Sequence, residues 1–368
     1  MTLFQKQCKF LPLRITGGPR YAPLFKQILI LISFVYLLPP LSAAEDPEYL
    51  ETLTLLKSHL VDPNLIKPKE LKSQTASALL QQIGFSSLLM SHPSIEDASP
   101  TPIRAEILQP YKIGYLRMPS FKPAKDWNTL YNTLAEWQKN EVFGLILDLR
   151  DFEGSSDFSG AAHAASLFSQ ANAVLFSTQG LQTAQQIYTG NQPQPITTRP
   201  LLMITNRRTI GAAEAFVASA RQSMGALILG RSTPGQAGIY SDFPLKSGKY
   251  VRIPTATAQL PDGTRLFGKP IQPDIPLYTE DLTERQALAE GQLSGPSSTI
   301  RELPSRQRIS EAALVKQDNP EFDEAAANQK KKKKDNTKTE TDLFQDITLI
   351  RAVDVLRGIQ LHSKMTGR

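Results

Sequence analysis

The 368-residue sequence predicts an α/β domain of layered sheet and helices, preceded by a small helical region. Two observations support this prediction. Between residues 106 and 280, short apolar runs alternate with segments whose apolar residues recur every three or four positions, which is typical of strands alternating with helices. One run, residues 142–149, is apolar on both faces, as strands of doubly covered parallel sheets are.

The elements expected inside this domain follow from the same pattern. Helices are predicted where the apolar period is 3.6 residues and strands where short apolar or alternating runs occur. The predicted strands cover residues 111–118, 142–149, 173–177, 201–205, 226–230, 240–245 and 250–258, and the predicted helices cover residues 123–139, 160–168 and 211–224.

The first 44 residues have the layout of a secretory signal peptide. Five basic residues precede an apolar run at residues 28–38, and two prolines and the small residues Ser42, Ala43 and Ala44 follow it. The run is shorter than the roughly 20 residues that a membrane span needs, so cleavage after Ala43 or Ala44 is expected, with an uncleaved anchor as the alternative. We therefore expect an exported protein of the periplasm or cell envelope.

Four further segments complete the expected organisation. Residues 45–90 have helical periodicity, and residues 91–105 are rich in Ser and Pro and predict a linker. Residues 281–345 include the lysine run at 330–334 and predict a charged, disordered linker. Residues 346–362 predict a helix with Asp346 as N-cap, although the sequence does not show where this helix docks.

Composition argues against several classes of function. The net charge of +6 arises almost entirely before residue 45, and beyond that point 36 basic residues face 35 acidic ones, so a nucleic-acid surface is not expected. The single cysteine, Cys8, lies in the signal segment, which leaves no thiol for catalysis, metal binding or disulfides. The histidines lack metal-ligand spacing, so no metal or cofactor is expected; they are His59, His92, His163 and His362.

Four segments in order resemble the tail-specific (C-terminal processing) serine peptidase family. The first is Asp148-Leu-Arg150, which precedes a loop containing Gly154. The second is residues 204–216, where a strand leads into a helix, and the third is the loop at residues 229–240. Gly268-Lys-Pro-Ile-Gln-Pro273-Asp274 resembles the family's closing signature. The resemblance implies a crotonase/ClpP-like core over roughly residues 111–276.

At the catalytic positions the sequence departs from the family. The resemblance places the nucleophilic serine at Gly211, the general-base lysine at Gln236 and the residue that orients the lysine at Tyr240. Glycine has no side-chain oxygen, and an amide does not accept a proton near neutral pH, so neither role can be filled. The backbone of Gly154 and Ala212 would retain part of the oxyanion pocket.

The predicted function is therefore that of an inactive protease relative which binds a polypeptide or an envelope protein in its cleft. The linker at 91–105 leaves no room for the peptide-binding PDZ module that this family usually carries there. Two alternatives remain open. One is an active endopeptidase with a relocated nucleophile, for which Thr209, Ser155 and Ser232 are candidates. The other is a structural component of the envelope, in which the C-terminal region makes the contacts.

Overall fold

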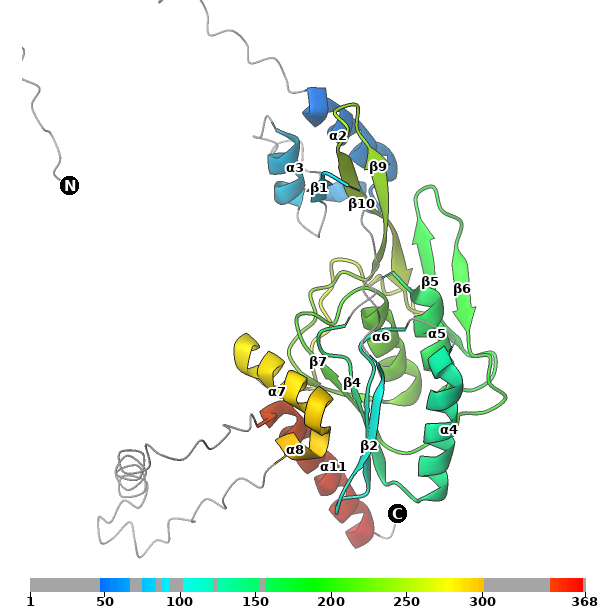
Figure 1. Cartoon of the computed structure of the whole chain (residues 1–368). Helices are drawn as coiled ribbons and strands as arrows, with labels where there is room; N and C mark the ends of the chain where they lie inside the picture. The colour runs from blue at the N-terminus through cyan, green and yellow to red at the C-terminus, as the bar shows by residue number, and fades with distance from the viewer. Residues whose placement is uncertain are drawn as a thin grey trace, which may run out of the picture. The chain divides into compact units, whose positions relative to one another are not determined.

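The computed structural model describes residues 47–66, 75–83, 88–92, 102–121, 125–152, 156–300 and 345–366 (Figure 1). The chain divides into two compact units, Met1–Pro47 and Glu48–Arg368. The second unit contains every element discussed below, except that Pro47, the first residue of the first helix, falls in the first unit. The predicted signal peptide and the lysine run at 330–334 lie outside the described residues.

A six-stranded sheet forms the centre of the α/β region, with strand order β11-β8-β7-β4-β3-β2. Its strands are β2 (Arg104–Leu108), β3 (Ile113–Arg117), β4 (Gly144–Asp148), β7 (Leu201–Thr205), β8 (Leu227–Gly230) and β11 (Ile275–Pro276). Only the β2–β3 pair is antiparallel. Every residue of β3, β4 and β7 is buried, which confirms that the apolar runs belong to a sheet covered on both faces.

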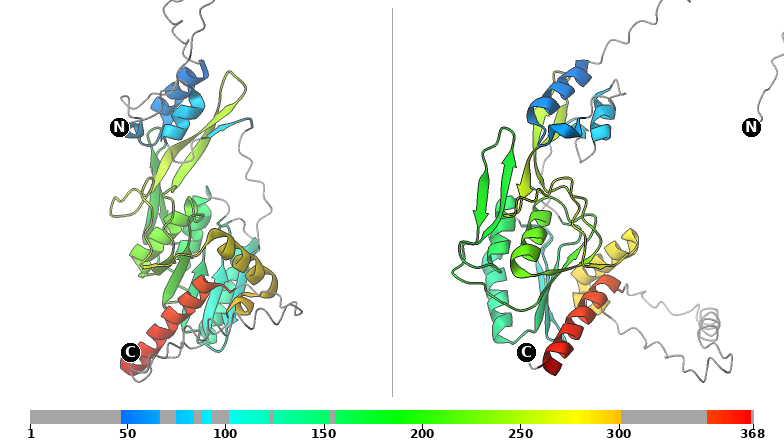
Figure 2. Two further views of the ribbon diagram at one scale, coloured as in Figure 1. Left: turned by 90° about the vertical axis from the view of Figure 1, so that its left-hand side faces the viewer. Right: turned by 180° about the vertical axis from the view of Figure 1, so that it is seen from behind.

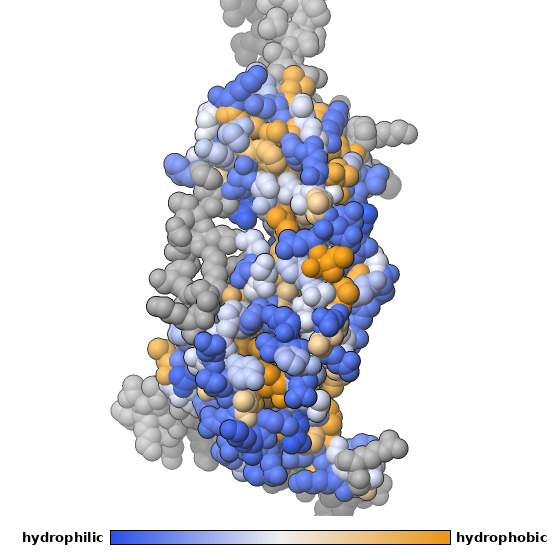
Figure 3. All heavy atoms as spheres, turned by 90° about the vertical axis from the view of Figure 1, so that its right-hand side faces the viewer, coloured by the Kyte–Doolittle hydropathy of each residue, from blue (hydrophilic) through white to orange (hydrophobic). Residues whose placement is uncertain are grey.

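A second sheet has strand order β1-β10-β5-β6, with β9 paired to β10, and all of its pairs are antiparallel (Figure 2). The strands are β1 (Leu88–Met90), β5 (Val174–Gly180), β6 (Gln186–Thr189), β9 (Gly238–Pro244) and β10 (Tyr250–Gln259). On the side of the molecule that carries β6 and α4 (Lys125–Lys139), apolar groups are scattered among hydrophilic ones (Figure 3).

The N-terminal region packs on this second sheet. It contains α2 (Pro47–His59), the 3-10 helix η1 (Pro63–Leu65) and α3 (Ala76–Ile83). Leu56, Leu60 and Leu79 are fully buried against Val251 and Ile253 of β10. The predicted helical region therefore exists, and its apolar face is covered by the tip of β10.

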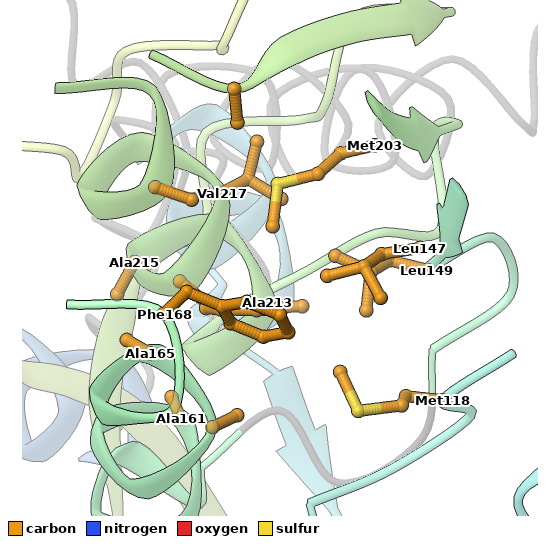
Figure 4. Packing of buried hydrophobic residues seen from close by; sticks show 14 of the residues in the cluster. Met118, Leu147, Leu149, Ala161, Ala165, Phe168, Met203, Ala213, Ala215 and Val217 are labelled. Carbon is orange, nitrogen blue, oxygen red and sulfur yellow. The ribbon is translucent and has the colours of Figure 1, made fainter. Parts of the chain in front are cut away.

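The core of the six-stranded sheet has two faces covered by different helices. On one face α4, α5 (Phe158–Ser166) and α6 (Ala212–Met224) pack on alternate strand residues, and Figure 4 shows Leu147, Leu149 and Met203 facing the small residues of α5 and α6. On the other face α11 (Ile347–Thr366) buries Leu349, Val353 and Leu356 against β4, β7 and β8.

Glycine permits one close approach in this core. A Cβ on Gly114 of β3 would lie 2.4 Å from a ring carbon of Trp137 and 2.9 Å from a methyl of Leu145. Because real Cβ contacts are longer than this, only glycine lets the indole of α4 lie directly on the strand. Trp137 is consequently 5% exposed and anchors α4 to the sheet.

Three sequence predictions need correction. The linker at 281–345 is wrong for residues 281–299, which form α7 (Asp281–Ser294) and α8 (Pro296–Thr299); residues 301–344 lie outside the described chain. The linker at 91–105 ends earlier than predicted, because β2 begins at Arg104. The C-terminal helix continues to Thr366, beyond the predicted residue 362, and the strands β1, β2, β6 and β11 were not predicted.

Candidate functional site

The site begins at Gly211, where the chain turns from β7 into α6. Its backbone has φ 64° and ψ −120°, a left-handed combination that L-residues rarely adopt. A sharp turn of this kind between a strand and a helix is the geometry in which hydrolases expose a nucleophilic side chain. Here the turn is present and the side chain is absent.

Glu214, three residues into α6, holds this turn together. Its carboxylate is 1% exposed. Oε2 accepts the N–H of Gly211 at 3.0 Å and the N–H of Gln236 at 2.6 Å, while Oε1 accepts the N–H of Gly235 at 2.6 Å. Gly211 and Gln236, to which the resemblance assigns the nucleophile and base positions, therefore meet at one carboxylate oxygen. The place of Glu214 in the first turn of α6 favours its contact with the helix N-terminus, whereas its contacts with Gly235 and Gln236 were not predicted from sequence.

Burial raises the pKa of Glu214 to about 7, and the hydrogen bonds from Thr233 and from the three backbone amides oppose that rise. All four of these groups are donors, so the ionised carboxylate is the form that matches its surroundings. The carboxyl group of Glu214 therefore titrates near neutral pH. Its proton state affects the hydrogen bonds that it accepts from the backbone of Gly211 and of Gln236.

The loop that carries Gln236 leads directly into β9. Gln236 is half-buried, and its carbonyl accepts the N–H of Gly238 at 2.7 Å. Tyr240 lies in β9 opposite Pro254 of β10, and the guanidinium carbon of Arg252 lies 5.4 Å from the centroid of its ring. Tyr240, at the position that the resemblance assigns to the lysine-orienting residue, thus lies on the second sheet, where its ring contacts the guanidinium of Arg252.

The start of α6 supplies the other half of the site. Ala212 is fully buried and is the first residue of the helix, and its N–H is one of those that a helix leaves without an intrahelical partner. Gly154, which the resemblance gives as the second oxyanion position, lies outside the described residues, as does Ser155.

The remaining candidate nucleophiles differ in their surroundings. Thr209 is fully buried; its hydroxyl donates to the carbonyl of Leu149 at 2.8 Å and accepts the N–H of Asn206 at 3.0 Å. It joins the ends of β4 and β7 and does not cap α6, whose N-cap is Gly211. Ser232 is half-buried in the loop after β8. A hydroxyl committed to two protein hydrogen bonds is a poor nucleophile.

Directly beneath this turn lies a buried cluster of charges centred on Arg150. The guanidinium is 0% exposed and makes ion pairs of 2.6 Å with Asp148, 2.6 Å with Asp346 and 3.5 Å with Glu284. Burial acts to raise the pKa of Asp148, but the charge and hydrogen bonds of Arg150 hold it below its usual value. The sequence indicated Asp148 and Arg150 as strand-end residues near the site, whereas their partners from α7 and α11 were not predicted.

Asn206 connects the charge cluster to the turn. Its amide donates to Glu284 Oε2 and to Asp151 Oδ1, both at 2.9 Å, and its backbone N–H binds Thr209. Asn206 is 3% exposed. The segments that follow β4 and β7 are therefore fixed to α7 and α11 by a continuous network of polar contacts.

The described part of the chain contains no group of three or more His, Cys, Asp or Glu residues arranged to hold a metal ion. His163, on α5, packs against Trp127 with ring centroids 4.4 Å apart. Within the described ranges, no helix is both long and apolar enough to cross a membrane.

Comparisons with known proteins agree with this geometry. The family model of peptidase family S41 matches residues 112–277. The chain is 28% identical over 172 residues to the chloroplastic C-terminal processing peptidase of Tetradesmus obliquus, covering 46% of this chain and 36% of that protein. It is 24% identical over 185 residues to the carboxyl-terminal-processing protease of Synechocystis sp., covering 50% of this chain and 41% of that protein. The chain thus spans about two fifths or less of the length of these curated relatives.

Among solved structures, a candidate peptidase from Parabacteroides merdae aligns with a TM-score of 0.51 and 18% identity. The alignment covers 68% of this chain and 93% of that one, and it supports the fold. The mixed α/β architecture, the strand-to-helix turn at Gly211 and the match across residues 112–277 lead to one assignment. Residues 112–277 of this chain match peptidase family S41, and the chain is similar to C-terminal processing peptidases.

Proposed function

We propose that this protein does not cleave peptide bonds and instead binds a polypeptide beside the Gly211 turn. One observation carries the proposal: the turn has a positive φ of 64°, which would strain any residue with a side chain, and the glycine that adopts it offers no nucleophile. Gln236 adds a second argument, because its amide cannot act as a general base.

Binding is supported by what the turn still offers. The N–H of Ala212 lies at the positive end of α6, where a peptide carbonyl oxygen is favoured. Glu214 fixes the turn and the Gln236 loop together, so the site is rigid before any ligand arrives. A preformed hydrogen-bond donor beside a rigid loop suits an extended polypeptide, whose carbonyls repeat along its length.

The test of inactivity is proteolysis of unstructured protein substrates by the purified full chain. The double variant Gly211→Ser with Gln236→Lys restores the family's side chains, and Gly211→Ala with Gln236→Lys is its matched control, because it adds the same Cβ and lysine without a nucleophile. We expect an inert parent, an inert control and cleavage by the serine variant. Cleavage by the parent that survives purification to homogeneity would refute the proposal.

The test of binding uses Ala212→Pro, since proline is tolerated at the first position of a helix and removes the N–H that would bind the peptide. Fluorescence anisotropy of a labelled unstructured polypeptide should show binding to the parent and weaker binding to this variant. Equal urea midpoints for the two proteins verify that the variant is folded. Binding that is unchanged by the substitution would exclude Ala212 from the site.

A relocated nucleophile is the first competing function. It predicts labelling by a fluorophosphonate probe that disappears when Ser155, Ser232 or Thr209 is replaced by alanine. The buried, doubly bonded hydroxyl of Thr209 argues against labelling there. A scaffold role for the C-terminal region is the second, and it is tested by replacing Lys330–Lys334 with glutamine, which leaves α7 and α11 intact.

Export to the periplasm or cell envelope is part of the same proposal and rests on the sequence of residues 1–44. Expression of the full chain in a bacterial host, followed by mass spectrometry of the periplasmic fraction, should give a mature N-terminus at Ala44 or Glu45. Full-length protein confined to the cytoplasm would contradict export.

A further inference from the structure

Strand β6 is an open edge of the second sheet. Its pairing is with β5 alone among the strands that the structure describes, and Figures 1 and 2 show its other side facing away from the sheet. Edge strands present unpaired N–H and C=O groups, and natural proteins protect them with charged residues, proline or bulges. The four residues of β6, Gln-Ile-Tyr-Thr, contain no charged residue and no proline.

The hydrogen bonds show which backbone groups of β6 face outward. Gly190, directly after the strand, donates to the carbonyl of Ala173 and accepts the N–H of Asn172, so its backbone groups face the β5 side. The register irregularity between Val174 and Phe176 puts the extra residue on β5, so the directions still alternate along β6, and Tyr188 and Gln186 also face β5. Ile187 and Thr189 therefore present their N–H and C=O groups to the open edge.

Side chains give the same picture. Tyr188 packs toward the core, with its ring 4.8 Å from that of Phe176, and Ile187 lies on the opposite face, 58% exposed. Val174 and Leu181 of the same hairpin are 44% and 54% exposed. The hairpin thus offers apolar side chains beside the open edge.

The composition around this edge is unusual. From residue 158 to residue 198 the sequence contains no Asp, Glu, Lys or Arg, although such residues make up 21% of the chain. An uncharged edge has nothing with which to select a charged partner, and it also has nothing that repels an identical copy. Two antiparallel copies related by a twofold axis bring the same short segment of each chain together, and a segment without charge is compatible with this arrangement.

We propose that β6 pairs with β6 of a second copy of this chain, antiparallel, with the twofold axis at Tyr188. In that register Ile187 of each copy exchanges both outward hydrogen bonds with Thr189 of the other, which satisfies every outward backbone group of the strand's last three residues. The two second sheets then form one continuous sheet, and Ile187 is covered by its cross-strand neighbour.

The register is tested by disulfide trapping in the full chain, with Cys8→Ser as the thiol-free parent. Hydrogen-bonded partners lie about 5.5 Å apart at Cα, within the range that a disulfide spans. Ile187→Cys combined with Thr189→Cys should therefore give a covalent dimer on oxidation. Each single variant is a matched control and should not form a covalent dimer. Identical residues of the two copies are offset by two positions in this register, so their Cα atoms lie about 8 Å apart or more.

Association itself is measured by light scattering after gel filtration over a range of concentrations. The parent should dimerise, Ile187→Pro should be monomeric because it removes an outward N–H without touching the β5–β6 hydrogen bonds, and Ile187→Thr should still dimerise. A parent that stays monomeric at every concentration overturns the proposal. Cross-linking of the single variants as strong as that of the double variant, or dimerisation of the proline variant, overturns it as well.

Discussion

Neutralising Asp346 tests whether the buried charge cluster holds the C-terminal helix on the sheet. Asp346 is 4% exposed, pairs with Arg150 at 2.6 Å, and caps α11 by accepting the N–H of Leu349 at 2.9 Å. Asn caps helices as well as Asp does, so Asp346→Asn keeps the cap and removes only the charge. Breaking a buried ion pair from one side costs about 3–5 kcal/mol.

The lower end of this range is expected, because Asp148 and Glu284 still face Arg150 in the variant. A loss of about 3 kcal/mol is large against a total stability of about 5–15 kcal/mol. Urea unfolding followed by tryptophan fluorescence is a suitable assay, since both tryptophans lie in α4, Trp137 being nearly buried.

The matched control is Asp354→Asn on the same helix. Asp354 pairs with Arg357 at 3.8 Å, but both side chains are more than 40% exposed, so the loss should stay below about 0.5 kcal/mol. If Asp346→Asn destabilised the protein no more than Asp354→Asn does, the cluster would not be what fixes α11, and apolar packing alone would account for its position.

Three more predictions concern the turn. Burial raises the pKa of Glu214 to about 7 from an ordinary 4.5. The protonated group therefore stabilises the folded protein fully below about pH 4.5, and this stabilisation is lost as the pH rises through about 7. In urea titrations across that interval, the free energy of unfolding of the wild type should fall by roughly 3 kcal/mol relative to that of Glu214→Gln. Gly211→Ala should lower the free energy of unfolding by about 1–3 kcal/mol, because alanine is strained at the positive φ of this position. Gly358→Ala, at an open position inside α11, should raise it by about 0.5–1 kcal/mol. Equal effects of the two substitutions in thermal unfolding would contradict this reasoning. Thr209→Val should cost about 1–3 kcal/mol by leaving the Asn206 N–H and the Leu149 carbonyl unpaired, and a neutral result in the same assay would show that those hydrogen bonds are dispensable.

Four of the six strands of the central sheet could be predicted from sequence because they are largely apolar, whereas β2, which contains Arg104 and Glu106, and the two-residue β11 could not. The runs containing β3, β4, β7 and β8 were all located, since a doubly covered strand has no polar face to obscure it. Helix α7 was missed for the opposite reason. Its buried residues, Glu284, Ala287 and Leu288, form too small an apolar stripe to register among charged neighbours.

At the site, the pattern of residues located the turn but not what stabilises it. Gly211 and Gln236 were selected from their places in the segments that resemble the family, so the proposed loss of the serine and the lysine rests on that resemblance. The role of Glu214 depends on a loop 21 residues further along, and that of Asp346 on a partner 196 residues away. Polar contacts across such separations leave no periodic trace in a single sequence, because they arise only when the elements pack.

The separation between Arg150 and Asp346 also bears on how the protein is made. At about 5–20 residues per second, the ribosome needs roughly 10–40 s to add the 196 residues between them. During that time Arg150 lacks one of its native carboxylate partners, and the sheet face that α11 covers in the native structure is not yet covered. This face of the sheet can therefore reach its native packing only after the segment that begins at residue 346 has been synthesised.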